Sequence, residues 1–157
     1  MERQTLVGTC GFSESQTRSF EDFDVLEVQQ SFYEPPRVVT AQGWRQRAPA
    51  GFVFTLKAWQ LITHKATSPT YRRLRTPLSD AERTQAGDLS WNAVTRMAWQ
   101  RTAALADALK SQAVVFQTPG SFLPTGQNIR RLRRFFRGHW PGRSPHGLRA
   151  SRRSLER

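Results

Sequence analysis

Two kinds of hydrophobic pattern alternate along this chain. Short apolar runs rich in β-branched and aromatic residues, which are typical of strands, are separated by segments in which apolar residues recur with a helical period. The predicted strands are residues 5–9, 24–30, 52–58 and 113–117. The predicted helices are a short one within residues 13–23 and longer ones at 36–48, 89–110 and 127–136, whereas 66–87 should be mostly loop.

Alternation of strands and helices predicts an α/β fold with parallel strands and helical crossovers. Four such units match the first four βα units of a (β/α)8 TIM-type barrel, or a small open sheet. The segment 89–110 is the strongest helix prediction, and its apolar residues fall close to one face: Val94, Met97, Ala98, Leu105, Ala106 and Leu109. Such a stripe indicates core packing rather than a cofactor site.

Each predicted strand carries a polar residue at or near its carboxyl end. These residues are Thr9, then Glu27, Gln29 and Ser31 on one face of the second strand, then Lys57 and Gln117. In parallel α/β folds, ligands bind in the crevice at that end of the sheet. The sequence therefore predicts a binding site there.

Glu27 and Lys57 should lie on adjacent strands. An inward carboxylate beside an inward ammonium can transfer protons or hold a polar ligand, so both are candidate catalytic residues. The alternative is a buried salt bridge that fills the interior. Lys57 is one of only three lysines among 24 basic residues, which suggests that its compact amine matters.

His64 is a third candidate catalytic residue, because it follows the third strand in a loop beside Thr63. It could equally be a structural histidine. Thr9, Gln29, Tyr33, Thr63 and Gln117 are candidate ligand-binding residues, and Phe32, Tyr33 and Trp59 could form an apolar wall. The single cysteine, Cys10, is expected to be a small buried residue. No metal site is predicted, and no cofactor is indicated.

The net charge of +12 is concentrated at the C-terminus. Residues 1–129 hold 14 basic and 11 acidic residues, whereas residues 130–157 hold 10 arginines and one glutamate. The terminal stretch, with its glycines and prolines, should be disordered in isolation. It could bind nucleic acid through phosphate contacts, or it could be a non-native tail from a shifted reading frame.

The chain shows no sign of membrane insertion or export. No apolar run approaches the roughly 20 residues of a membrane-spanning helix, and the start "MERQTLVG" lacks an apolar signal region. We therefore expect a cytoplasmic protein whose partner is a small polar molecule rather than a membrane.

Four segments together resemble the YecE-like family of domains of unknown function. They are "VGTCGF", "VLEVQQSFYEPP", "GFVFTLKAWQLITH" and "VVFQTPGSF", and the resemblance covers about residues 5–136. The resemblance implies a TIM-type barrel of unsettled biochemical role. By motif, it implies site residues that coincide with the strand ends: Gly8, Thr9, Gly11, Glu27, Phe32, Tyr33, Lys57, Thr63, His64, Gln117 and Pro119.

The family barrel continues into four further strands that this sequence does not show. We therefore expect residues 1–136 to be the N-terminal half of such a barrel and residues 137–157 to be an Arg-rich tail. Three functions stay open at this stage. They are an enzyme or binder of a small polar ligand with its site at the strand ends, a nucleic-acid binder acting through the tail, and an inactive truncated fragment. A true half-barrel would also expose sheet edges and self-associate.

Overall fold

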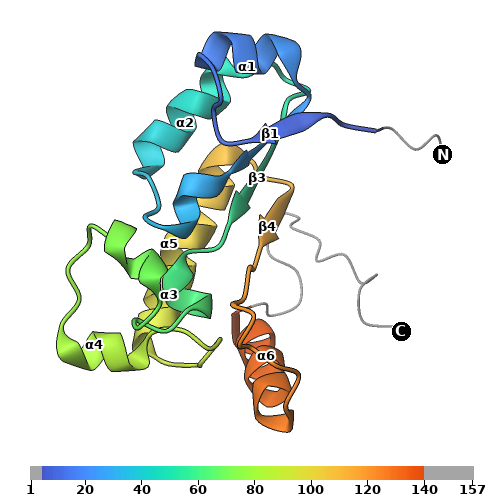
Figure 1. Ribbon diagram of the computed structural model, residues 1–157. Coiled ribbons are helices and arrows are strands. Elements are labelled where there is room, and N and C mark those ends of the chain that lie inside the picture. Colours follow the sequence, from blue (N-terminus) through green and yellow to red (C-terminus); the bar gives the residue numbers. More distant parts are fainter. Residues whose placement is uncertain (1–4, 140–157) are drawn as a thin grey trace.

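A four-stranded parallel sheet organises the computed structural model, which describes residues 5–139 apart from the side chains of residues 138 and 139 (Figure 1). Its strands are β1 (Gly8–Cys10), β2 (Val25–Val28), β3 (Val53–Lys57) and β4 (Ala113–Val115). They lie in the order β1-β2-β3-β4, and every neighbouring pair is parallel. The α/β prediction is confirmed. The sheet is consistent with part of a TIM-type barrel, but it is not closed.

Three helices cover one face of this sheet (Figure 1): α1 (Gln16–Asp22), α2 (Val38–Arg47) and α5 (Ala93–Leu109). Every second strand residue points toward them, because strand side chains alternate between faces. The buried core between sheet and helices is apolar and includes Phe20, Leu26, Val28, Trp44, Phe54, Leu56, Leu105 and Leu109. Burial of this apolar area is the main force that holds the helices on the sheet.

The opposite face of the sheet is accessible and carries polar side chains near the carboxyl ends of the strands. Glu27, Thr55 and Lys57 are half-buried there, and Val115 keeps 39% of its surface exposed. Within residues 5–139, no helix packs on this face. The side of the sheet that would look into a barrel is therefore open.

A second cluster of buried residues lies beyond the carboxyl ends of the strands. It joins the first half of α5 to α3 (Gln60–Thr63), the 3-10 helix η2 (Pro69–Arg73) and α6 (Gly126–His139). Its largest members are aromatic: Trp59, Tyr71, Trp99 and Phe135. The strand ends are therefore supported by two packed clusters, one on the helix-covered face of the sheet and one beyond its carboxyl edge.

The prediction of a strand over residues 24–30 is wrong at its C-terminal end. β2 ends at Val28, and Gln29–Phe32 form the 3-10 helix η1. The Ser31 Oγ lies 2.5 Å from the Val28 carbonyl oxygen and 2.7 Å from that of Lys57, so its one proton is shared between two backbone acceptors. A side chain that bonds the local backbone in this way favours a turn over a continued strand. Gln29 and Ser31 therefore do not extend the polar face that begins at Glu27.

The prediction that residues 66–87 are mostly loop missed η2 and a further helix, α4 (Asp80–Gln85). Its signal was present in the sequence. Ser79 caps the helix by accepting from the Glu82 N–H, and the Glu82 carboxylate accepts from the Ser79 N–H, at 3.3 and 2.8 Å. This reciprocal pair is the capping box that a Ser-x-x-Glu sequence encodes.

Three smaller expectations also change. The long helix begins at Ala93 rather than at residue 89, because Leu89 has a positive φ of 51° and Asn92 caps the helix. Cys10 is exposed rather than buried. α6 extends to His139, and the remainder of the predicted tail, residues 140–157, lies outside the described residues. No helix of the described chain has the length and apolar character needed to cross a membrane.

Replacing Leu56 by alanine tests the core under the sheet. Leu56 is fully buried in β3, so Leu56→Ala should lower the free energy of unfolding by about 2–5 kcal/mol, measured by urea denaturation. Val39, 63% exposed on α2, provides the matched control. Val39→Ala should change stability by less than about 0.5 kcal/mol. Equal effects of the two substitutions would contradict the assigned core.

Candidate functional site

Lys57 lies at the centre of a polar cluster on the open face of the sheet. Its Nζ donates to Oε1 of Gln117 at 2.8 Å and forms an ion pair with Oε1 of Glu27 at 3.6 Å. Glu27 and Gln117 lie 30 and 60 positions away from Lys57 in the sequence, yet the adjacent strands bring the three residues together. The predicted Glu27–Lys57 neighbourhood is present.

Strand register explains this meeting. Glu27 is paired with Thr55 in β3, and Lys57 lies two residues beyond Thr55 on the same face. Lys57 in turn is paired with Val115, and Gln117 lies two residues further on, just past the end of β4. Three neighbouring strands thus each present one polar side chain toward the same place at their carboxyl ends.

The cluster remains accessible to a ligand. The side chains of Lys57 and Glu27 are 15% and 21% exposed, so neither is sealed in the interior as a buried salt bridge would be. An ammonium group has three N–H donors, and Glu27 and Gln117 occupy two directions around it. A third donor is therefore available for an oxygen of a bound molecule.

Gln29 and Tyr33 line a different place, a cavity of about 230 Å³ on the helix-covered side of β2. Leu26, Val28 and Trp44 form its apolar wall. The Arg73 guanidinium, a further lining residue, lies over the Tyr33 ring at 3.9 Å from its centroid. The structure therefore places these two predicted ligand-binding residues apart from the Lys57 cluster, beside a cation that the sequence did not indicate.

Thr63 and His64 form a buried pair. The Thr63 hydroxyl and His64 Nδ1 are 2.9 Å apart, and the His64 ring packs edge-on against Phe32. Burial lowers the pKa of His64 below its usual value of 6.5, so the neutral imidazole is favoured. Within the described chain, no hydrogen bond or ion pair joins this pair to Lys57, Glu27 or Gln117.

Thr9 shapes the backbone next to Glu27. Its hydroxyl donates to the Gly11 carbonyl at 2.9 Å, and the Gly11 N–H donates to the Glu27 carbonyl at 2.8 Å. Gly11 has a φ of +83°, which favours glycine at this turn. Thr9 therefore supports the turn beside the cluster, with its side chain engaged by the backbone.

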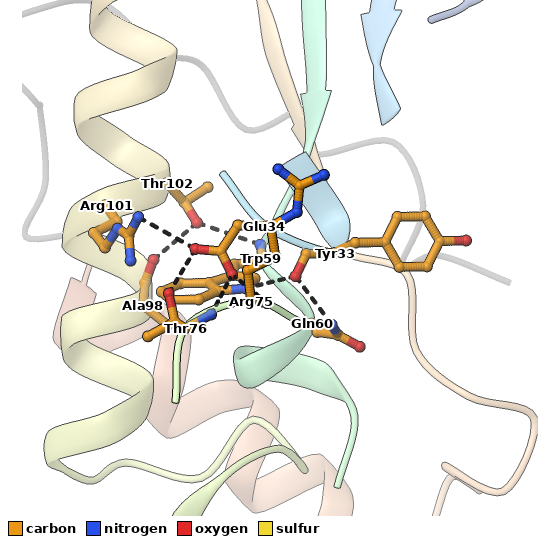
Figure 2. A network of polar contacts seen from close by, with 9 residues as sticks. All are labelled: Tyr33, Glu34, Trp59, Gln60, Arg75, Thr76, Ala98, Arg101 and Thr102. Carbon is orange, nitrogen blue, oxygen red and sulfur yellow. Dashed lines mark hydrogen bonds and ion pairs between the residues drawn. The ribbon is translucent and has the colours of Figure 1, made fainter. Parts of the chain in front are cut away.

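Glu34, which the sequence analysis did not single out, connects three segments above the strand ends (Figure 2). Its carboxylate accepts from the N–H groups of Arg75 and Thr76 at 3.3 and 3.2 Å, and from the Thr76 hydroxyl at 2.6 Å. It also pairs with Arg101 of α5 at 3.5 Å. Glu34 therefore ties the segment after η1 to the loop before α4 and to α5.

The neighbouring Tyr33 carbonyl is a second anchor in the same network (Figure 2). It accepts from Trp59 Nε1 at 3.1 Å and from Gln60 Nε2 at 3.0 Å. The backbone N–H of Trp59 donates to the Thr102 hydroxyl, and the Arg101 guanidinium lies over the Trp59 ring. Because Trp59 follows Lys57 by two residues, this network fixes the chain that leaves the end of β3.

The sequence contained one signal for this network. Glu34 stands within the "SFYEPP" segment directly after two aromatic residues, and a carboxylate drawn toward the interior with them needs hydrogen-bond partners. Arg101 gave no signal, because an exposed arginine on a long helix usually faces solvent. Among the described residues, no group of three or more His, Cys, Asp or Glu side chains could hold a metal ion.

Comparison with known protein families finds a match over most of the chain. The sequence profile of a family described as "Protein of unknown function DUF72" matches residues 7–150. No curated protein and no solved structure matches the chain.

The Glu34 network can be tested by removing its charge. Glu34→Gln should lower the free energy of unfolding by about 1–3 kcal/mol, because hydrogen bonds to an ionised carboxylate are stronger than those to an amide. Chemical denaturation provides the measurement. Glu14, in an exposed ion pair with Arg18 at 3.8 Å, is the control, and Glu14→Gln should cost less than about 0.5 kcal/mol. Indistinguishable variants would mean that the network is not structural.

The buried His64 should make stability depend on pH. Its pKa in the folded state lies below 6.5, so the unfolded chain takes up the proton first as the pH falls through 6.5. Stability is therefore lost from about pH 6.5 downward, and His64→Gln should reduce the stability difference between pH 7.5 and 5.5 by up to about 1 kcal/mol. An unchanged difference in the variant would contradict a buried, neutral His64.

Proposed function

This chain belongs to the DUF72 family of proteins of unknown function, and we propose that it binds a small polar molecule at the carboxyl ends of its strands. The observation that supports the proposal is the convergence of Glu27, Lys57 and Gln117 on the open face of the sheet. A partly exposed ammonium beside a carboxylate is suited to a ligand that carries an anionic or carbonyl oxygen.

Each residue of the cluster has a distinct role in this proposal. Lys57 holds an oxygen of the ligand and stabilises negative charge that develops on it. Glu27 accepts or returns a proton, since its carboxylate lies beside the same position. Gln117 orients the Lys57 amine through its side-chain carbonyl oxygen. This arrangement supports acid–base chemistry on a small polar, for example phosphorylated, compound.

His64 has a positioning role in this proposal rather than a catalytic one. The imidazole is only 6% exposed, and Nδ1 faces the Thr63 hydroxyl. Its ring supports Phe32, and the adjacent Ser31 holds the Lys57 carbonyl. Through these contacts His64 keeps the end of β3 in place, and proton transfer is assigned to Glu27.

The cavity beside Gln29 and Tyr33 lies apart from this site, on the helix-covered side of β2. Arg73 supplies a cation there, over the Tyr33 ring, and Gly11 lets the backbone turn close to the cavity. The roles proposed for Glu27, Lys57 and Gln117 do not depend on this cavity.

The binding proposal can be tested with a panel of phosphate monoesters and hydroxy acids, screened by ligand-detected NMR. At least one class should bind the unmodified protein, and Lys57→Met should weaken that binding at least about tenfold because the charged donor is lost. The circular dichroism spectrum and the thermal melt report whether the variant stays folded.

Lys110 provides the matched control, because it is an exposed lysine at the end of α5. Lys110→Met should leave the binding of every panel member unchanged. Panel members that bind equally to Lys57→Met would show that the strand-end cluster is not their site. If no member binds the unmodified protein, the proposed ligand class is wrong.

A further inference from the structure

Four arginines form a stripe along the exposed side of α6. Arg130, Arg133, Arg134 and Arg137 are all exposed, and their spacing places them within about 100° of arc on one helix face. At a rise of 1.5 Å per residue, the stripe extends for about 10 Å along the helix. This surface belongs to the described part of the chain and is separate from the strand-end cluster.

The rest of α6 fixes this stripe in orientation. Phe135, 1% exposed, packs on Trp99 of α5 and on Phe116, which follows β4. Arg131, on the flank of the helix, binds Oδ2 of Asp88 at 3.1 Å. Because its apolar side is held in the second cluster, α6 turns the four arginines toward solvent (Figure 1 shows the helix below β4).

The stripe is one wall of an open groove. The groove has a volume of about 600 Å³ and is lined by Trp91 together with the four arginines. Trp91 is half-buried, and the Arg96 guanidinium lies 5.8 Å from its ring centroid, which adds a further cation at the edge. The groove therefore combines several guanidinium groups with an aromatic surface.

No acidic side chain of the described chain lines this groove. Asp88, on the loop before Trp91, is already paired with Lys65 at 3.2 Å and with Arg131. The four guanidinium groups of the stripe have no acidic partner among residues 5–137. The positive charges of the four guanidinium groups repel one another in the unbound protein. A bound polyanion would remove this repulsion.

We propose that this groove binds the phosphate backbone of a nucleic-acid strand. Guanidinium groups form bidentate bonds with phosphate, and a row of them about 10 Å long can engage consecutive phosphates. An aromatic residue within a basic groove is the combination found in sites for single strands. The binding element is thus α6 with Trp91, and not only the Arg-rich residues that follow it in sequence.

Two other polyanionic partners fit the surface less well. An amphipathic helix binds an anionic membrane by inserting its apolar side, but the apolar side of α6 is buried against α5 and residue 116. An acidic polypeptide would satisfy the charges, but its carboxylates do not stack on an aromatic ring as a nucleobase does, so the Trp91 surface would add little. The arginine row and the aromatic wall together favour nucleic acid.

The test uses the full-length protein and a fluorescein-labelled oligouridylate, with binding followed by fluorescence anisotropy at several KCl concentrations. The quadruple variant R130Q/R133Q/R134Q/R137Q removes the stripe without altering buried residues. The matched control R18Q/R37Q/R72Q/R83Q removes the same charge from exposed positions outside the groove. Circular dichroism verifies that both variants remain folded.

The stripe variant should bind at least about tenfold more weakly at about 100 mM KCl. The slope of the logarithm of the association constant against the logarithm of the KCl concentration should become shallower by about 2–3. Each phosphate contact in a single strand contributes about 0.7 to this slope, and four arginines are removed. The control should stay within about threefold of the unmodified protein, because it keeps the groove. This pattern would support the proposal.

Three results would overturn it. Equal losses in the two variants would show that binding follows net charge rather than the groove. No binding of the unmodified protein at low salt would exclude the site altogether. Competition by poly-glutamate or by vesicles with anionic lipid, as effective as unlabelled oligouridylate, would assign the surface to a protein or a membrane instead.

Discussion

The Glu34 carboxylate is the contact on which the architecture around the strand ends depends. It joins the segment after η1, the loop at Arg75 and Thr76, and α5 through Arg101, and these are far apart in sequence (Figure 2). A carboxylate is suited to this position because its two oxygens accept several hydrogen bonds at once. The adjacent Tyr33 carbonyl holds Trp59 and Gln60, so the same short segment also fixes the chain that leaves β3.

The alternation of side chains along the strands links the fold to the proposed site. Leu26, Phe54 and Leu56 face the helices and build the core, so the residues between them must face the other way. That second face carries Glu27 and Lys57, and no helix of the described chain covers it. The pattern that stabilises the sheet therefore also determines where polar chemistry can occur.

The basic side chains of interest lie in two different environments. At the strand ends, a single ammonium is held by a carboxylate and an amide, which suits one small ligand. On α6, four guanidinium groups stand in a row without acidic partners among residues 5–137, which suits an extended polyanion. A bound small molecule and a bound strand would occupy separate surfaces, because Lys57 lies at the carboxyl end of β3 and the arginine stripe lies along α6.

The sequence by itself determined the α/β class and the parallel strands, because the alternation of strand and helix periods is a local property, and it placed Glu27 and Lys57 near the carboxyl ends of adjacent strands. It also contained the capping box of α4, which went unrecognised. Only the tertiary structure decided that Ser31 ends β2, that Arg73 lies over Tyr33 and that Arg101 reaches Glu34. Each of those contacts joins residues from different elements, and side-chain pairing between elements depends on packing that no local pattern encodes.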